Sequence, residues 1–395
     1  MGKSLFANLS PANKYILVCC FSMFVVNGLY AMVLGPLLPY ISNEYNLSDT
    51  ISGMLLSAHQ AGALVAGFVA GILPFYMGRK LSIVLLCTFV MVGLIAIVLT
   101  GNPILLITGF LFTGISRGGI SNFNNTVVTE VTNGNAPAIN FLHSSFAVGA
   151  LASPFLLILG IHIAGDFGWR LTALVLVVLV GITVVMLACA KIEKVDKAAR
   201  RAKLSYKFLK DRHVWYNTGV LFFYLCVEAG VTGWLVKYFV DTGTLTSGYA
   251  FVLASLLWAV MLVGRLCVAF MGSKLSRKAV LAASAVGMTI FYIILLATQS
   301  ATLITVAIGG FGLSMAAVYP TAIANLGKTI KHYPMSIGVV LVISGIGAIV
   351  MPIVTGVLSD AFGIWAGMSA IIAAIIMMMI CAGLVIFDRS SLNAE

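Results

Sequence analysis

Five ionisable side chains stand inside long apolar stretches of the sequence. A charged side chain at the centre of a bilayer costs about 2.5–3.5 kcal/mol on translocon scales, so it persists where it pairs or contacts a polar solute. No clustered acids, histidines or cysteines have the spacing of a metal site or an acid–base pair, so these residues predict a solute pathway and no catalytic centre. The five are His59, Arg117, His143, Glu228 and Arg265.

Arg117 begins a polar helical face. Ser121, Asn124 and Asn125 follow it at i+4, i+7 and i+8, which are spacings that share one face of a helix. Such a face is unsuited to lipid. We therefore predict that it lines a cavity and donates hydrogen bonds to the hydroxyls or to an anionic group of a solute. The alternative interpretation is a structural polar seam between helices.

Glu228 is the one carboxylate that the sequence places near the middle of a predicted span, and Tyr224 precedes it by one helical turn. Glu228 is a candidate carrier of a coupling proton, because burial and a neighbouring cation act on its protonation in opposite directions. The alternative is a permanent ion pair with Arg265. Arg265 follows Trp258 by seven residues on the same face, and it is predicted either to contact the solute or to anchor a gate.

The other candidates are amides, histidines and aromatic residues inside predicted spans. A sugar site would combine hydrogen bonds from amides with an aromatic platform, and these residue types supply both. The alternative for each is helix packing or a place in the aromatic belt at the membrane interface. To the residues above, the predicted substrate-binding set adds Asn27, Tyr30, His59, Gln60, His143 and Tyr319.

The composition predicts a membrane protein. Of 395 residues, 61% are hydrophobic and 9% are charged, whereas soluble domains carry about 25% charged residues. The net charge of +11 does not indicate nucleic-acid binding, because the basic residues sit in the short connections between apolar stretches. The seven cysteines lie within apolar stretches, without disulfide or metal spacing. No cofactor is expected, and without a phosphate-binding loop an ATP-driven pump is not expected.

The apolar stretches predict an all-α integral membrane protein with twelve transmembrane helices, since a crossing needs roughly 20 apolar residues. We predict two pseudo-symmetric six-helix bundles, residues 1–190 and 213–395, joined by a basic cytoplasmic linker at 191–212. The distribution of lysine and arginine places both termini in the cytoplasm. The predicted spans are 15–40, 50–74, 80–99, 103–128, 139–162, 168–190, 215–240, 247–271, 279–298, 301–326, 335–358 and 364–387.

An internal repeat supports the two bundles. Segments 149–154 and 347–352 both begin with Gly-Ala and end with Pro, in the fifth and eleventh predicted spans. The basic pair 79–80 after the second span matches the pair 277–278 after the eighth. Matching positions in two halves are typical of transporters built from parallel repeats.

The loop after the second span carries Gly71, Gly78, Arg79 and Lys80. This pattern resembles the loop signature of the major facilitator superfamily, with Phe75 where that family usually has aspartate. The resemblance implies the fold of that superfamily, and it implies that the four matching residues belong to a gating loop.

Within the superfamily, the chain resembles the fucose-permease-like sugar transporters. Segments 140–154, 223–228, 264–265 and 319–321 resemble the fifth, seventh, eighth and tenth helices of that family. Fucose permeases carry a carboxylate in the first helix, whereas the comparable stretch here, 27–30, has none.

Together these observations predict a secondary transporter that works by alternating access, as a uniporter or an ion-coupled symporter. A monosaccharide or related sugar is the first expected solute. The alternatives are an organic anion or sugar acid bound through intramembrane arginine, and drug efflux. We do not expect an intramembrane enzyme, which would need an acid–base or metal constellation. We do not expect a channel, which would need a filter-like segment, because the sequence shows neither feature. The expected partners are a small-molecule substrate, a co-transported proton or sodium ion and the lipid bilayer, with no nucleic acid. The expected state is a monomer in a bacterial cytoplasmic membrane.

Overall fold

A computed structural model of the chain describes residues 9–132, 136–190, 192, 207–271, 276–333 and 335–388. Every secondary-structure element within these residues is a helix. The described part of the predicted linker is limited to Ile192 and residues 207–212, so the rest of that prediction lies outside the described residues.

The chain divides into two compact units. The first comprises residues 1–45 and 58–201, and the second comprises 46–57 and 202–395. The helices of the first unit are α1 (Pro11–Tyr45), α2 (Asp49–Ile72), α3 (Pro74–Met77), α4 (Arg79–Leu99), α5 (Pro103–Val131), α6 (Ala136–Ala164), η1 (Gly165–Phe167) and α7 (Gly168–Cys189). The first turns of α2, up to Ser57, group with the second unit.

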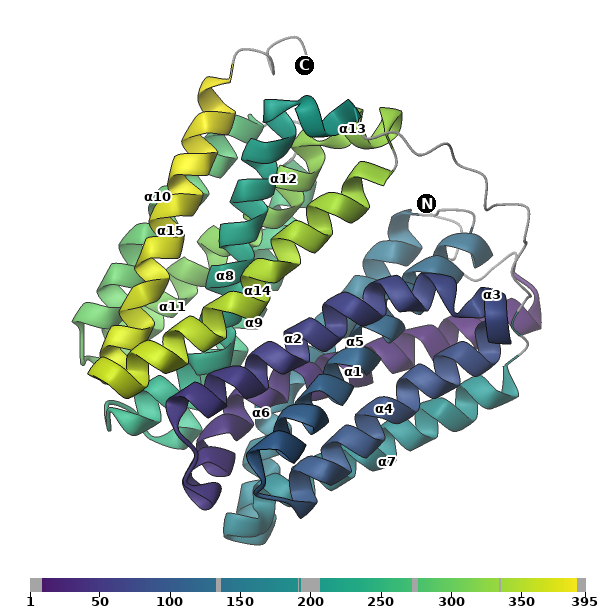
Figure 1. Cartoon of the computed structure of the whole chain (residues 1–395), viewed down its shortest axis with the longest axis horizontal. Helices are drawn as coiled ribbons and strands as arrows, with labels where there is room; N and C mark the ends of the chain where they lie inside the picture. The colour runs from purple at the N-terminus through teal and green to yellow at the C-terminus, as the bar shows by residue number, and fades with distance from the viewer. Residues whose placement is uncertain are drawn as a thin grey trace. The chain divides into compact units, whose positions relative to one another are not determined.

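The second unit begins with the short η3 (Lys207–Lys210). The core of this unit is formed by α8, which packs against α14 and α15 (Figure 1). In chain order the helices are α8 (Arg212–Asp241), α9 (Ser247–Met271), α10 (Arg277–Ala297), α11 (Ala301–Ala316), α12 (Val318–Asn325), α13 (Gly327–His332), α14 (Met335–Phe362) and α15 (Ile364–Phe387).

The predicted all-helical membrane fold is confirmed. Eleven segments of the described residues are long and apolar enough to cross a bilayer, and one of them, Ala138–Cys189, contains both α6 and α7. These two helices have 29 and 22 residues, so each can cross alone. The protein is therefore an integral, multi-pass membrane protein.

The predicted span 301–326 is two helices, α11 and α12, which meet at Ala317. The cause is Pro320, which has no backbone N–H to donate to the carbonyl of Ala316 four residues earlier. Pro154 and Pro352, in contrast, lie inside the continuous helices α6 and α14. Pro36 and Pro39 likewise lie inside the continuous helix α1.

Candidate functional site

The first unit holds a polar cluster at the middle of α5. Arg117 is the central residue of this 29-residue helix. Its Nη1 donates a hydrogen bond of 3.0 Å to Oε1 of Gln60, and it lies 3.4 Å from Nε2 of His59. Both partners belong to α2, so the cluster joins two helices of the unit.

Close backbone contact brings α2 and α5 together at this level. A Cβ atom on Gly114 would lie 1.9 Å from the carbonyl oxygen of His59, which is closer than any side chain can approach. Because Gly114 has no side chain, Arg117, three residues further along α5, can reach Gln60. A larger residue at position 114 would force the two helices apart.

The ring of His59 is held in one tautomer. The hydroxyl of Thr113 donates to the carbonyl of Phe110 at 2.7 Å, so its oxygen accepts from Nδ1 of His59 at 2.8 Å. Nδ1 therefore carries the proton, and Nε2 offers its lone pair to Arg117. His59 is only 3% exposed, whereas Arg117 and Gln60 are half-buried. The neutral imidazole thus orients the guanidinium.

The other residues of the predicted polar face lie in different surroundings. Asn124 is 0% exposed, and its Nδ2 donates to the carbonyl of Cys20 in α1 at 3.2 Å. Asn125 is half-buried, and its Nδ2 donates to the carbonyl of Ser121 in the same helix at 2.8 Å. Asn124 therefore holds α5 against α1, and Arg117, Ser121 and Asn125 keep partial exposure.

Three further candidates of the first unit lie on α1 and α6. Asn27 and Tyr30 are both fully buried in α1, and within the described part of the chain the side-chain oxygen Oδ1 of Asn27 has no hydrogen-bond partner. The buried hydroxyl of Tyr30 lies within electrostatic range of Arg117. His143 is exposed on α6, and its ring contacts Phe24 edge-on with 5.9 Å between centroids.

The second unit holds its own cluster, drawn from α8, α9 and α12. The buried hydroxyl of Tyr224 lies next to the guanidinium of Arg265 without reaching hydrogen-bond geometry, and Glu228 acts electrostatically on both residues. The rings of Tyr224 and Tyr319 are 6.2 Å apart between centroids. Trp258, two turns before Arg265 on α9, is half-buried.

Of the predicted gating-loop residues, Gly71 lies in the last turn of α2, Gly78 lies between α3 and α4, and Arg79 and Lys80 begin α4. Gly78 has φ of +80°, a conformation that favours glycine, and it ends the short α3. Arg79 then makes two hydrogen bonds of 2.5 and 2.6 Å to the carboxylate of Glu130 near the end of α5. Lys80 and Gly71 are exposed. A cavity of about 250 Å³ beside this ion pair is lined in part by Phe75.

The sequence did not predict an ionic cluster in the second unit. Lys237 is 5% exposed, lies 3.1 Å from Asp49 and pairs with Asp241 one turn later. The carboxylate of Asp360 accepts hydrogen bonds of 2.8 Å from the backbone N–H groups of Asp49 and Thr50, at the start of α2. The spacing of Lys237 and Asp241 at i,i+4 was the available sequence signal.

Neither cluster has the composition of a metal centre. Among the described residues, no group of three or more histidine, cysteine, aspartate or glutamate side chains could hold a metal ion. The seven cysteines are free thiols. The chemistry that these sites offer is hydrogen bonding and charge, which suits binding of a polar solute.

Solved structures with a similar fold are membrane transporters. A bacterial homologue of the human lysosomal transporter Spinster, inward-facing and occupied, has a TM-score of 0.79 at 16% identity, over 95% of this chain and 96% of that one. The Escherichia coli fucose:proton symporter has a TM-score of 0.63 at 18% identity, over 95% and 99%. At these identities the likeness shows the fold alone, so the resemblance to fucose permeases stays a prediction.

Two curated relatives match part of the sequence at 26% identity. They are the membrane protein MosC of Rhizobium meliloti, over 145 residues, and a gallate transporter of Pseudomonas putida, over 143 residues. Each match covers 36% of this chain, and it spans only 35% and 32% of the respective relative. A family model described as Major Facilitator Superfamily matches residues 20–274, which is more than half of the chain. By its sequence and by its helical fold, the chain belongs to the Major Facilitator Superfamily.

Proposed function

We propose that this transporter carries a small organic acid with hydroxyl groups, and that Arg117 binds the carboxylate. The observation that supports this is the placement of Arg117 at the centre of α5, where Gln60 and His59 orient its half-buried guanidinium. A guanidinium held in this way presents its charge and a planar fork of donors, which matches the geometry of a carboxylate.

Three further observations favour an acid over the sugar that the sequence ranks first. Two of the amides expected to bind a sugar, Asn27 and Asn124, are fully buried within the helix packing of the first unit. One of the curated relatives is named as a transporter of gallate, which is an organic acid. The clusters also contain two arginines, Arg117 and Arg265, beside the single carboxylate of Glu228.

A neutral monosaccharide is the second candidate, and one observation favours it. Tyr224 and Tyr319 lie 6.2 Å apart between ring centroids, and Trp258 is half-buried on the neighbouring α9. Such aromatic surfaces can stack against the apolar face of a pyranose. A hydroxylated acid would use the same rings, so competition between the two solute classes separates the candidates.

The proposal is tested by uptake of labelled organic acids into proteoliposomes. Arg117→Gln should raise KM roughly 10–100-fold, because a hydrogen bond to a charged group contributes about 1.5–3 kcal/mol. Arg117→Lys should keep part of the affinity. The matched control is Arg170→Gln, because Arg170 is held by Glu44 and by the Tyr45 hydroxyl at the end of α1. Unchanged uptake in Arg117→Gln, with full competition by neutral sugars, would contradict an acid substrate.

We also propose that transport is coupled to protons through Glu228, with sodium as the alternative ion. The support is the position of Glu228 near the middle of α8, within electrostatic range of Arg265. We further propose that both termini lie in the cytoplasm, as the distribution of lysine and arginine predicts. We also propose a monomer in a bacterial cytoplasmic membrane, with residues 1–190 and 213–395 as its two bundles.

A further inference from the structure

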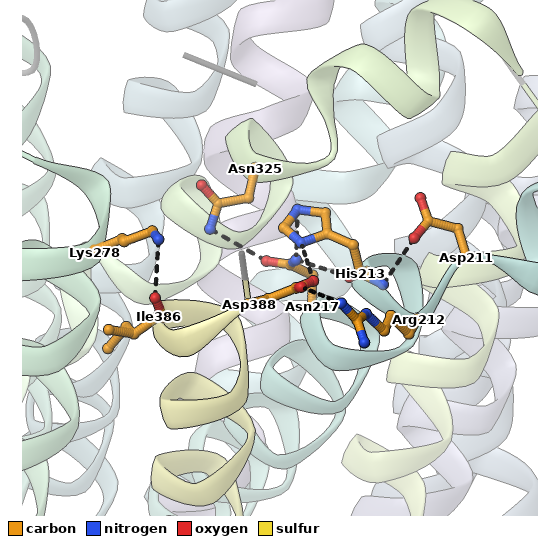
Figure 2. A network of polar contacts seen from close by, with 8 residues as sticks. All are labelled: Asp211, Arg212, His213, Asn217, Lys278, Asn325, Ile386 and Asp388. Atoms are coloured by element: carbon orange, nitrogen blue, oxygen red, sulfur yellow. Dashed lines mark hydrogen bonds and ion pairs between the residues drawn. The ribbon is translucent and has the colours of Figure 1, made fainter. Parts of the chain in front are cut away.

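A network of polar contacts occupies the end of the second unit where α8 begins (Figure 2). The side chain of Asp388, which follows α15, is 1% exposed and lies 3.1 Å from Arg212 and 3.6 Å from Nδ1 of His213. Lys278 of α10 donates to the carbonyl of Ile386 at 2.9 Å. The start of α8, the end of α15 and the start of α10 are therefore joined by side chains.

Asn217 is the central residue of this network, and it is fully buried. Its Nδ2 donates to the carbonyl of His213 at 2.9 Å and lies 3.3 Å from Nε2 of the same histidine. Its Oδ1 accepts a hydrogen bond of 3.2 Å from Asn325, the last residue of α12. Both donors and the acceptor of Asn217 are thus used, and one of these bonds reaches a different helix.

The helix that is hydrogen-bonded to Asn217, α12, is short and is interrupted at both ends. α12 has only eight residues, and it is separated from α11 at Ala317, where Pro320 cannot donate a backbone hydrogen bond. At its other end the chain turns at Leu326. The position of α12 therefore depends on side-chain contacts with its neighbours.

The opposite end of α12 carries a residue of the second cluster. Tyr319 is the second residue of this helix, and its ring faces that of Tyr224 at 6.2 Å between centroids. A rigid helix of eight residues is about 12 Å long, so a displacement at one end is felt at the other. Asn325, which is hydrogen-bonded to Asn217, and Tyr319, which faces Tyr224, thus lie at opposite ends of α12.

We propose that Asn217 is a positioning residue of the solute site, which fixes α12 through Asn325 and thereby sets where Tyr319 stands against Tyr224. The ring of His213 lies between Asp388 and Asn217, with Nδ1 3.6 Å from the Asp388 carboxylate and Nε2 3.3 Å from Nδ2 of Asn217. An exposed contact from Arg277 to the carbonyl of Ala324, at 3.3 Å, supplies a weaker second support. This proposal rests on the assignment of Tyr319 to the solute site.

The first test is hydrogen exchange of the full-length protein, without solute, followed on a peptide that covers α12. Asn217→Ala and Asn325→Ala should each speed exchange of α12 roughly three- to tenfold, as expected for loss of one hydrogen bond. The double variant should exchange no faster than the singles, because both lose the same bond. Asn325 is half-buried, so its variant keeps the test valid if Asn217→Ala folds poorly.

The matched control is Thr218→Val. Thr218 is the buried neighbour of Asn217, and its hydroxyl donates only to the carbonyl of Val214 within α8, at 2.7 Å. This variant should leave exchange of α12 unchanged. Unchanged exchange in Asn325→Ala, or additive effects in the double variant, would overturn the proposal.

The second test is transport. Asn325→Ala should raise KM severalfold with little change in maximal rate, and Asn325→Gln should recover part of the affinity. An unchanged KM beside faster exchange would show that α12 is held but does not position the site, and would overturn the proposal. Exchange is measured without solute, so it decides whether Asn217 holds α12 even if the carried solute is not an organic acid.

Discussion

Arg117 and Arg265 both belong to membrane-spanning helices, and their surroundings differ, since Arg117 is half-buried and Arg265 is exposed. Arg117, in the first unit, is oriented by the neutral acceptors Gln60 and His59. Arg265, in the second unit, lies next to the hydroxyl of Tyr224 and within the field of Glu228. Gln60 and His59 fix the direction of the Arg117 guanidinium, whereas the charge of Arg265 is partly offset by the carboxylate that acts on it. We therefore propose that the same residue type binds substrate in one unit and acts on a carboxylate in the other.

The strongest test of this difference removes the charge of Glu228. Glu228→Gln should abolish accumulation of solute against a gradient, because the side chain can no longer release a proton. Exchange of labelled for unlabelled solute should persist, since Arg117 remains in place. Accumulation driven by a pH gradient and counterflow in proteoliposomes measure the two activities separately. Normal accumulation in this variant would remove Glu228 from the coupling step.

A second test asks whether Arg265 serves Glu228. Arg265→Gln should lower the melting temperature, because it removes a cation that acts on the carboxylate of Glu228. The double variant Arg265→Gln with Glu228→Gln should recover most of the melting temperature. If the double variant is no more stable than Arg265→Gln, the two residues are independent, and the contrast with Arg117 loses its basis.

The smallest expected effect concerns the support of Arg117. Thr113→Val removes the oxygen that accepts from Nδ1 of His59, so the ring loses its fixed tautomer. Uptake should show KM raised roughly two- to tenfold, in line with one neutral hydrogen bond, with an unchanged maximal rate. Thr108→Val on the same helix is the control, because its hydroxyl donates only to the carbonyl of Ile104. Equal effects of the two substitutions would contradict the orienting role of His59.

The helical fold could be read from the sequence because lipid imposes one requirement, a long apolar helix, on each crossing. The division at Ala317 was not predicted, because the missing backbone N–H of Pro320 is shared by Pro154 and Pro352, which lie inside continuous helices. The sequence did not predict which neighbouring helix each helical face would contact. Arg117 and Asn124 share a face by spacing, but α5 meets α2 near Arg117 and meets α1 near Asn124. Which neighbour lies opposite depends on how helices cross, and sequence periodicity carries no record of that.

The ionic cluster shows the same limit at longer range. Asp360 caps the start of α2 from 311 positions away along the chain. No local pattern connects an aspartate near the end of α14 with backbone amides in α2. The pairing of Lys237 with Asp241 one turn away was the part that spacing could have revealed.

The start of α2 has a consequence for attempts to produce the protein in pieces. Residues 46–57 group with the second unit, although the chain places them before most of the first. A polypeptide severed between 191 and 212 would leave the later fragment without Asp49, the partner of its buried Lys237. Asp360 in that fragment would also lose the two amides that it caps. The later fragment is therefore complete only when the earlier one supplies this dozen residues in trans.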